Sequence, residues 1–345
     1  MNPIINFILL SSMIAGTILT MTSHHWVSAW LGLELNTLAI IPIISKTHHP
    51  RATEASTKYF LIQAASSALV LLSGVINAHS HGSWDITQLS NNFAKITLTT
   101  ALATKLGLAP VHFWLPEVLQ GVPILTALII ATWQKIAPMA LLITVWDLIP
   151  TTITLMMGLT STIIGGLGGL NQTQLRKMMA FSSIAHLGWM MVAITFAPNL
   201  TLLNLTLYIT LTSSTMMAMH FTMSKTLQNV MLIPSHSAIT ASLFLLSLLS
   251  LGGLPPLSGF SPKWLILQEL ATYNLTPLAL TMAITALLSL MFYLRTTYIS
   301  TMTLPPTTIT LKNTWRYKPH SYTPNFPTLL LMSLFLLPIT PMMTQ

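Results

Sequence analysis

Long apolar stretches recur through this chain, separated by short polar segments, and they constrain its fold more than any motif does. An apolar run of about 20 residues is long enough to cross the hydrocarbon core of a bilayer as an α-helix. Only 14 Lys or Arg and 6 Asp or Glu occur among 345 residues, or 6% of the chain, whereas a soluble globular domain has about 25% charged residues. The sequence therefore predicts an all-α, polytopic membrane protein with a single transmembrane domain.

The apolar stretches between polar residues predict about eleven transmembrane helices. The first stretch has no basic region and no Arg-rich amphipathic segment, so we expect a first membrane helix and neither a cleaved signal nor a transit peptide. The predicted spans cover residues 2–21, 24–45, 56–78, 92–110, 121–145, 149–169, 174–195, 200–223, 239–272 (interrupted), 275–299 and 325–342.

Charged residues in the predicted loops segregate by side. The loops after odd-numbered spans carry Asp85, Asp147 and Glu269 and no Lys or Arg. The positive-inside rule then places the N-terminus on the inner side and the C-terminus on the outer side. Glu117 is the one acidic exception, in a segment bounded by prolines. The loops after even-numbered spans carry the basic residues Lys46, Arg51, Arg176, Lys177, Lys225, Lys312, Arg316 and Lys318.

Glycine and proline interrupt the fourth span at 105–117 and the ninth at 251–264. Proline removes a backbone donor, and non-helical backbone at membrane depth must be buried in protein or line a hydrated cavity. We therefore predict that 252–259 is non-helical within the membrane and that its freed carbonyls face Lys263 or water. Because the breaks lie five spans apart, they favour two inverted five-helix repeats, 1–147 and 148–299, followed by a loop and a last helix in 300–345.

Four ionisable residues lie deep inside otherwise apolar stretches: Glu34, Lys105, Lys135 and Lys263. A charge near the bilayer centre costs at least about 2.5–3.5 kcal/mol on insertion scales. A buried Glu–Lys pair is a two-state element, because both groups stay charged together and one tends to become neutral when they separate. We predict that Glu34 and Lys105 approach to ion-pair distance, directly or through one water, and that the three lysines form a proton-relaying line parallel to the membrane. Static buried ion pairs or lysines that snorkel to the interface are the alternative.

Two histidines are further relay candidates, His112 between the prolines of the first break and His186 midway along the seventh span. Imidazole titrates near neutrality, although a packed core histidine is an equally good interpretation of each. Glu54 and Lys58 have the spacing of a helical i,i+4 ion pair.

Several kinds of site are not expected in this chain. It contains no cysteine, which excludes disulfides, thiolate metal sites and Cys-ligated iron–sulfur clusters. It has no run of basic residues that would indicate nucleic-acid binding. No phosphate-binding loop, nucleophile elbow or HExxH motif is present, so we expect no cofactor or metal here.

The break segments 105–117 and 251–264, together with 169–177 and 182–186, closely resemble the signature of the antiporter-like membrane-arm subunits of respiratory complex I. The short N-terminus and residues 54–60 narrow the resemblance to the chain 2 family of the animal mitochondrial NADH–ubiquinone oxidoreductase. The resemblance implies a proton-pumping subunit of the inner mitochondrial membrane, with its N-terminus in the matrix and its C-terminus in the intermembrane space. NADH oxidation and ubiquinone reduction would occur on other subunits, which would bind NADH, FMN, the iron–sulfur clusters and ubiquinone.

By motif, Glu34 and Lys105 match the family's Glu–Lys pair, Lys135 its central lysine and Lys263 the lysine on the second broken helix. Eleven spans are three fewer than in the wider family, which implies that a partner covers the surface those helices would shield. Other membrane-arm subunits and lipids, cardiolipin among them, are the expected partners. An autonomous cation/proton antiporter of the same fold and a non-pumping subunit that only transmits force or charge are the alternatives.

Overall fold

The computed structural model describes residues 3–236, 238–303 and 336–341, and the described residues are mostly helical. Eight of their helices are long and apolar enough to cross a membrane, as expected for a multi-pass membrane protein. The chain divides into two compact units, Met1–Ser161 and Thr162–Gln345.

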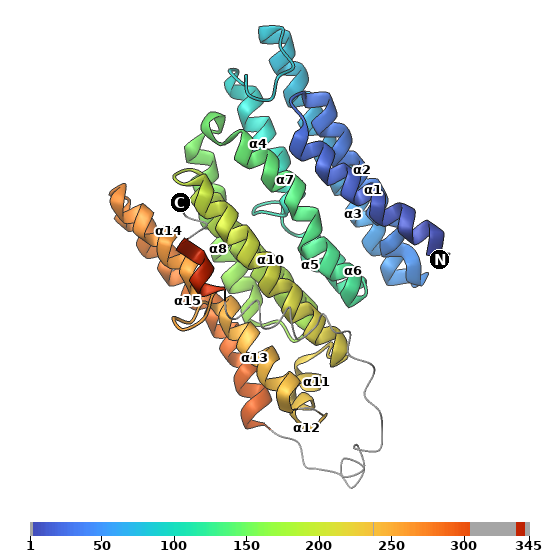
Figure 1. Cartoon of the computed structure of the whole chain (residues 1–345), viewed down its shortest axis with the longest axis vertical. Coiled ribbons are helices and arrows are strands. Elements are labelled where there is room, and N and C mark those ends of the chain that lie inside the picture. Colours follow the sequence, from blue (N-terminus) through green and yellow to red (C-terminus); the bar gives the residue numbers. More distant parts are fainter. Residues whose placement is uncertain (1–2, 237, 304–335, 342–345) are drawn as a thin grey trace. The chain divides into compact units, whose positions relative to one another are not determined.

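The first unit begins with a stack of three long helices, which run side by side in blue in Figure 1. Shorter helices around the first break follow, and α8 leads from this unit into the second. The helices are α1 (Pro3–Thr22), α2 (Trp26–Ile44), α3 (Pro50–His81), α4 (Asn92–Leu106), α5 (Trp114–Gly121), α6 (Ile124–Ala131), α7 (Trp133–Thr144) and α8 (Thr151–Leu170).

Two glycines set the close packing of α1 on α2. A Cβ added to Gly16 would lie 2.9 Å from the carbonyl oxygen of Gly32, and a Cβ added to Gly32 would lie 2.8 Å from that of Gly16. In membranes, helices cannot rely on the hydrophobic effect to associate, so small residues that let backbones approach are favoured at their contacts. The Gly16–Gly32 contact therefore fixes the distance between the first two helices.

The loops after α1 and α3 meet at one end of the first unit. His25 and Asp85 form an isolated antiparallel bridge, in which the Trp26 N–H donates to the Trp84 carbonyl (3.0 Å). The His25 ring stacks on Trp84 with a centroid distance of 5.6 Å, and its Nδ1 accepts from the Val27 N–H at the start of α2. The sequence predicted these two loops on the same side, and the bridge agrees with that.

The second unit contains α9 (Leu175–Ile194), α10 (Pro198–Phe221), α11 (Leu227–Met231), α12 (Ile233–His236), α13 (Ala238–Gly252), α14 (Phe260–Thr272), α15 (Thr276–Met302) and a 3₁₀ turn at Leu337–Ile339. α13 packs against α10 and α15. The loops before α9 and after α10, both predicted on the inner side, meet in a second isolated bridge between Gln174 and Thr226.

An arginine that the sequence analysis did not single out closes one end of α8. Arg295 of α15 donates from both terminal nitrogens to the carbonyls of Leu170 and Gln172. These carbonyls lie at and just beyond the C-terminal end of α8, where backbone acceptors have no helical partner. The guanidinium therefore caps α8, which is the reason a cation is tolerated inside an apolar helix.

Each predicted span up to residue 299 coincides with a described helix or with a pair of helices. The helices at the breaks, α4, α13 and α14, are shorter than the eight long apolar ones, so the count of eleven is not confirmed. Most of the predicted span 325–342 lies outside the described residues, as do Lys312, Arg316 and Lys318.

Both predicted breaks are present. The prediction of non-helical backbone at 252–259 is confirmed for 253–259, because α13 ends with Gly252 and α14 begins at Phe260. The first break separates α4 from α5. A third discontinuity was not predicted: Thr132 separates α6 from α7 within the span expected at 121–145. The Thr132 backbone departs from helical geometry (φ −114°, ψ −68°), although its hydroxyl and its N–H both donate to the Leu128 carbonyl.

Candidate functional site

Glu34 and Lys105 lie in the first unit, where the charge of Glu34 acts on Lys105. Lys105, in the last turn of α4, is only 5% exposed. Its Nζ and the Glu34 Oε2 are both buried, and neither has a hydrogen-bond partner among the described residues. No direct ion pair joins them within that part of the chain, so the predicted pair remains a prediction in its water-bridged form. The Glu34 charge also acts on the buried Tyr59 of α3.

Lys105 and Lys135 line the same small cavity in the first unit. The cavity volume open to the centre of a water molecule is about 10 Å³. This is close to what one buried water requires. Lys135 is 2% exposed and lies in the first turn of α7. The remaining polar lining comes from Asn36, Thr37, Tyr59, Gln63, Trp114 and Gln134.

Neutral amides organise the walls of this cavity. Gln134 Nε2 donates to the Asn36 carbonyl (3.2 Å), which ties α7 to α2. Gln63 Nε2 donates to the Lys105 carbonyl (3.3 Å), which ties α3 to the end of α4. Both side-chain atoms of the Asn36 amide are buried and have no hydrogen-bond partner among the described residues. A buried amide without hydrogen bonds is costly in free energy. A water molecule in the cavity, which could bond to it, is therefore favoured.

The first break places the Lys105 side chain at a helix end. Gly107 adopts a left-handed conformation (φ +80°) and its N–H donates to the Ala103 and Thr104 carbonyls, which is a common helix C-terminus. The indole N–H of Trp114, in the first turn of α5, donates to the Thr104 carbonyl (3.1 Å). The last turn of α4 is thus fixed from two sides.

Lys263, in the second unit, is held by backbone carbonyls. It is 6% exposed, and its Nζ donates to the carbonyls of Gly252 (2.9 Å) and Leu251 (3.4 Å). In an uninterrupted helix these two carbonyls would accept from residues 255 and 256, which are both proline and have no N–H. The prediction that the freed carbonyls face Lys263 is confirmed.

His186 lies in the middle of α9, in a polar cluster of the second unit. Its ring is 5.5 Å from that of Tyr208 on α10, and the Tyr208 hydroxyl bonds to the Ser183 side chain. Tyr293 of α15 is buried near Ser182. The cluster gathers hydroxyl groups from α9, α10 and α15, and the ring of its Tyr208 lies beside that of the predicted histidine.

His112 occupies the first break. It is buried, its Nδ1 lies 3.3 Å from the Pro110 carbonyl oxygen, and its ring packs on Phe113. It does not line the cavity of Lys105 and Lys135. These contacts suit a packed histidine as well as a relay.

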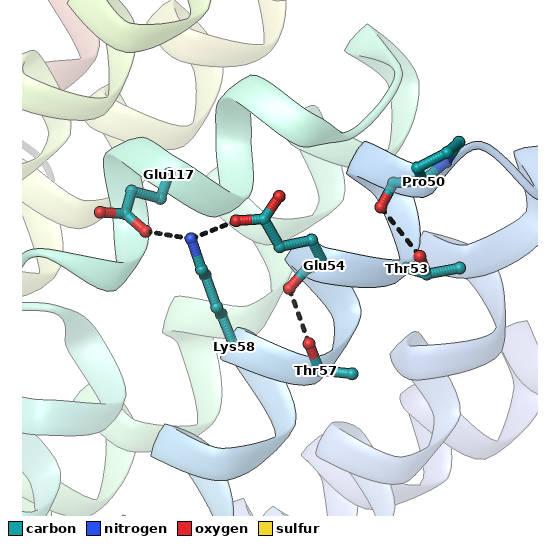
Figure 2. A network of polar contacts seen from close by, with 6 residues as sticks. All are labelled: Pro50, Thr53, Glu54, Thr57, Lys58 and Glu117. Carbon is teal, nitrogen blue, oxygen red and sulfur yellow. Dashed lines mark hydrogen bonds and ion pairs between the residues drawn. The ribbon is translucent and has the colours of Figure 1, made fainter.

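Lys58 bridges two carboxylates at the exposed start of α3. Figure 2 shows its Nζ between Glu54 (2.6 Å) and Glu117 (2.7 Å). The predicted Glu54–Lys58 pair is confirmed. The sequence analysis missed Glu117 as a partner, since 59 positions separate it from Lys58. The network joins α3 to α5, next to the first break.

Within the described ranges, no three His, Cys, Asp or Glu residues gather where they could hold a metal ion. Asn36, Gln63 and Gln134 were not singled out from the sequence, because they carry no charge. A signal was nevertheless present, since an amide inside an apolar span is itself costly unless it is bonded.

Comparison with known proteins agrees with this architecture. Residues 23–289 match the model of the NADH:quinone oxidoreductase/Mrp antiporter membrane family, and 290–344 match the NADH dehydrogenase subunit 2 C-terminus. The NADH-ubiquinone oxidoreductase chain 2 of Varanus nebulosus is 83% identical over 345 residues, covering 100% of both chains. That of Xenopus laevis is 52% identical over 342 residues, covering 99% of each.

A chain of respiratory complex I from Thermus thermophilus shares the fold. Its TM-score is 0.84 at 24% identity, and the match covers 98% of this chain and 80% of that one. The similarities to the family models and to the curated relatives extend over nearly the whole sequence. The chain therefore belongs to the NADH:quinone oxidoreductase/Mrp antiporter family, and within it to the NADH–ubiquinone oxidoreductase chain 2 proteins.

Proposed function

We propose that this chain moves protons through a buried relay of Glu34, Lys105 and Lys135 in the first unit and Lys263 in the second. The chain is a proton-translocating membrane-arm subunit of complex I, the H⁺-translocating NADH:ubiquinone reductase. The relay is the route by which redox energy released on other subunits would be used here. NADH, FMN, iron–sulfur clusters and ubiquinone would be bound elsewhere in the complex.

The cavity shared by Lys105 and Lys135 is the observation that carries this proposal. Two buried lysines on different helices line one cavity, which has room for about one water molecule. A proton leaving the Lys135 ammonium would pass to this water while the water gives one of its own to a neutral Lys105 amine. Glu34 would favour the charged form of Lys105, because an opposite charge nearby stabilises it.

In the second unit, the cluster of His186, Tyr208 and Tyr293 supports a continuation of the relay. Hydroxyl and imidazole groups both donate and accept protons. Tyr293 packs near Gly252, where a Cβ would lie 3.5 Å from its ring, and the Gly252 carbonyl accepts from Lys263. We include His186 in the route and keep His112 as a second candidate at the first break.

The same proposal includes eleven spans arranged as two inverted repeats, 1–147 and 148–299, and a last helix within 300–345. It places the chain in the inner mitochondrial membrane, with the N-terminus in the matrix and the C-terminus in the intermembrane space. The two inter-loop bridges support the pairing of loops by side, because each joins loops predicted on one side, and the matrix side follows from the positive-inside rule. Neighbouring antiporter-like and small membrane subunits and lipids such as cardiolipin would cover its apolar outer faces.

The test is the number of protons pumped per electron by the assembled complex in proteoliposomes, with Lys135→Met replacing the protonatable site by an apolar chain of similar length. We expect a lower ratio, because the cavity then loses one of its two proton carriers. Lys95→Met is the matched control, since Lys95 lies in the first turn of the same α4 that carries Lys105 and outside the cavity. A normal ratio for Lys135→Met would remove this lysine from the relay.

A further inference from the structure

The backbone at Gly253 has two properties that bear on Lys263. Gly253 follows the last residue of α13 and adopts a left-handed conformation (φ +85°). Its N–H donates to the Leu249 (3.2 Å) and Ser250 (3.0 Å) carbonyls, which completes the helix end. The next two carbonyls, of Leu251 and Gly252, are left for the Lys263 ammonium.

The space above Gly253 is filled by Lys263 itself. A Cβ on Gly253 would lie 3.0 Å from Nζ, 3.1 Å from Cδ and 3.4 Å from Cε of that side chain. The lysine could yield only by moving its end, and its end is the part that bonds the carbonyls. The missing Cβ therefore leaves the room in which the ammonium reaches these carbonyls.

We propose that Gly253 is a positioning residue for Lys263, and that the C-terminal end of α13 acts as the counter-charge of that lysine. The carbonyl end of a helix carries a partial negative charge that favours a cation. In the first unit a carboxylate, Glu34, acts on Lys105, whereas the Lys263 ammonium donates to main-chain carbonyls. The inference rests on the proposed role of Lys263 in the relay and adds the element that holds it.

Alanine variants of three other glycines distinguish this positioning role from a general role in packing. A Cβ on Gly252 would make only ordinary contacts, at 3.5 Å or more, so Gly252→Ala serves as the matched control. Gly82 has a similar left-handed backbone (φ +71°) with nothing within 4 Å of an added Cβ, so Gly82→Ala measures backbone strain alone. A Cβ on Gly259 would lie 1.8 Å from the Ser250 carbonyl oxygen, so Gly259→Ala marks structural disruption.

The experiment measures assembled complex, quinone reductase turnover and protons pumped per electron for these variants and for Lys263→Met. We expect Gly253→Ala to assemble as well as Gly82→Ala but to pump fewer protons per electron, approaching the ratio of Lys263→Met. In the Lys263→Met background, Gly253→Ala should cause no further loss, because its effect passes through that lysine. Gly253→Asn should behave like Gly253→Ala, since Asn tolerates the left-handed region yet still carries a Cβ.

Each other outcome is informative. If Lys263→Met lowers the ratio and Gly253→Ala does not, the positioning role is wrong and the relay stands. If Gly253→Asn restores the normal ratio, strain and not contact explains Gly253→Ala, and the inference is overturned. A normal ratio for Lys263→Met itself would remove both the lysine from the relay and the role inferred for Gly253.

Discussion

At the scale of single residues, the two halves hold their lysines by different means. Lys105 has a carboxylate nearby but no direct bond to it, while Lys263 is bonded to the end of a helix. A lysine without a direct bond to its counter-charge changes its environment when a single water or side chain moves. Lys105 is therefore the better candidate for the responsive member of the relay.

Glu34 should matter for stability as well as for pumping. Glu34→Gln keeps the shape of the side chain but leaves the buried Lys105 without its opposite charge. We expect a lower melting temperature of the complex and fewer protons per electron. The loss of unfolding free energy should be smaller than the about 3–5 kcal/mol typical of a broken buried pair, since no direct bond is lost.

The control for this prediction removes both charges. Glu34→Gln combined with Lys105→Met should regain thermal stability, because no buried charge is then left alone, but it should not regain pumping. A double variant that melts as low as Glu34→Gln would show that Glu34 stabilises the fold by another contact.

Charge singled out the residues of the proposed relay, because each charged group in an apolar span costs enough to require a reason. Arg295 was also charged, yet its role was not predicted. Its acceptors, at Leu170 and Gln172, lie about 125 positions earlier in the chain. Spacing along the sequence carries no information about such contacts.

At the scale of helices, the contact of α1 with α2 should be intolerant of a single methyl group. In Gly32→Ala the Cβ would lie 2.6 Å from Thr20 Cγ2 and 2.8 Å from the Gly16 carbonyl oxygen. Overpacking of this kind costs about 1–3 kcal/mol. We expect less assembled complex and a lower melting temperature, measured against Ala15→Leu on the exposed face of α1. Equal behaviour of the two variants would contradict the close-contact interpretation.

Helix interruptions could be predicted where the sequence contains proline or paired glycines. The adjacent prolines at 255 and 256 predicted both the helix interruption after α13 and the free carbonyls that accept from Lys263. The interruption at Thr132 has no proline or glycine beside it, and a hydroxyl bond to the preceding turn like that of Thr132 also occurs inside an unbroken helix, at Thr212 of α10. A residue type common in membrane helices gives no sequence signal for this event.

At the scale of the whole molecule, sidedness can be tested directly because the chain has no cysteine of its own. Thr87→Cys, in the loop between α3 and α4, and Gln228→Cys, in α11, are both at exposed positions. Five predicted spans separate them, so an impermeant maleimide should label them from opposite sides of the membrane. Labelling of both from one side would show that a span between them was wrongly assigned.

The bridge between His25 and Asp85 has a consequence for biogenesis. Its two residues lie 60 positions apart, with α2 and α3 between them. The bridge can form only after α2 and α3 have both crossed the membrane, so that the segment after α3 lies on the same side as His25. Its closure would then hold the open end of the α2–α3 hairpin together, so a chain stalled before residue 85 would carry this hairpin with its two ends untied.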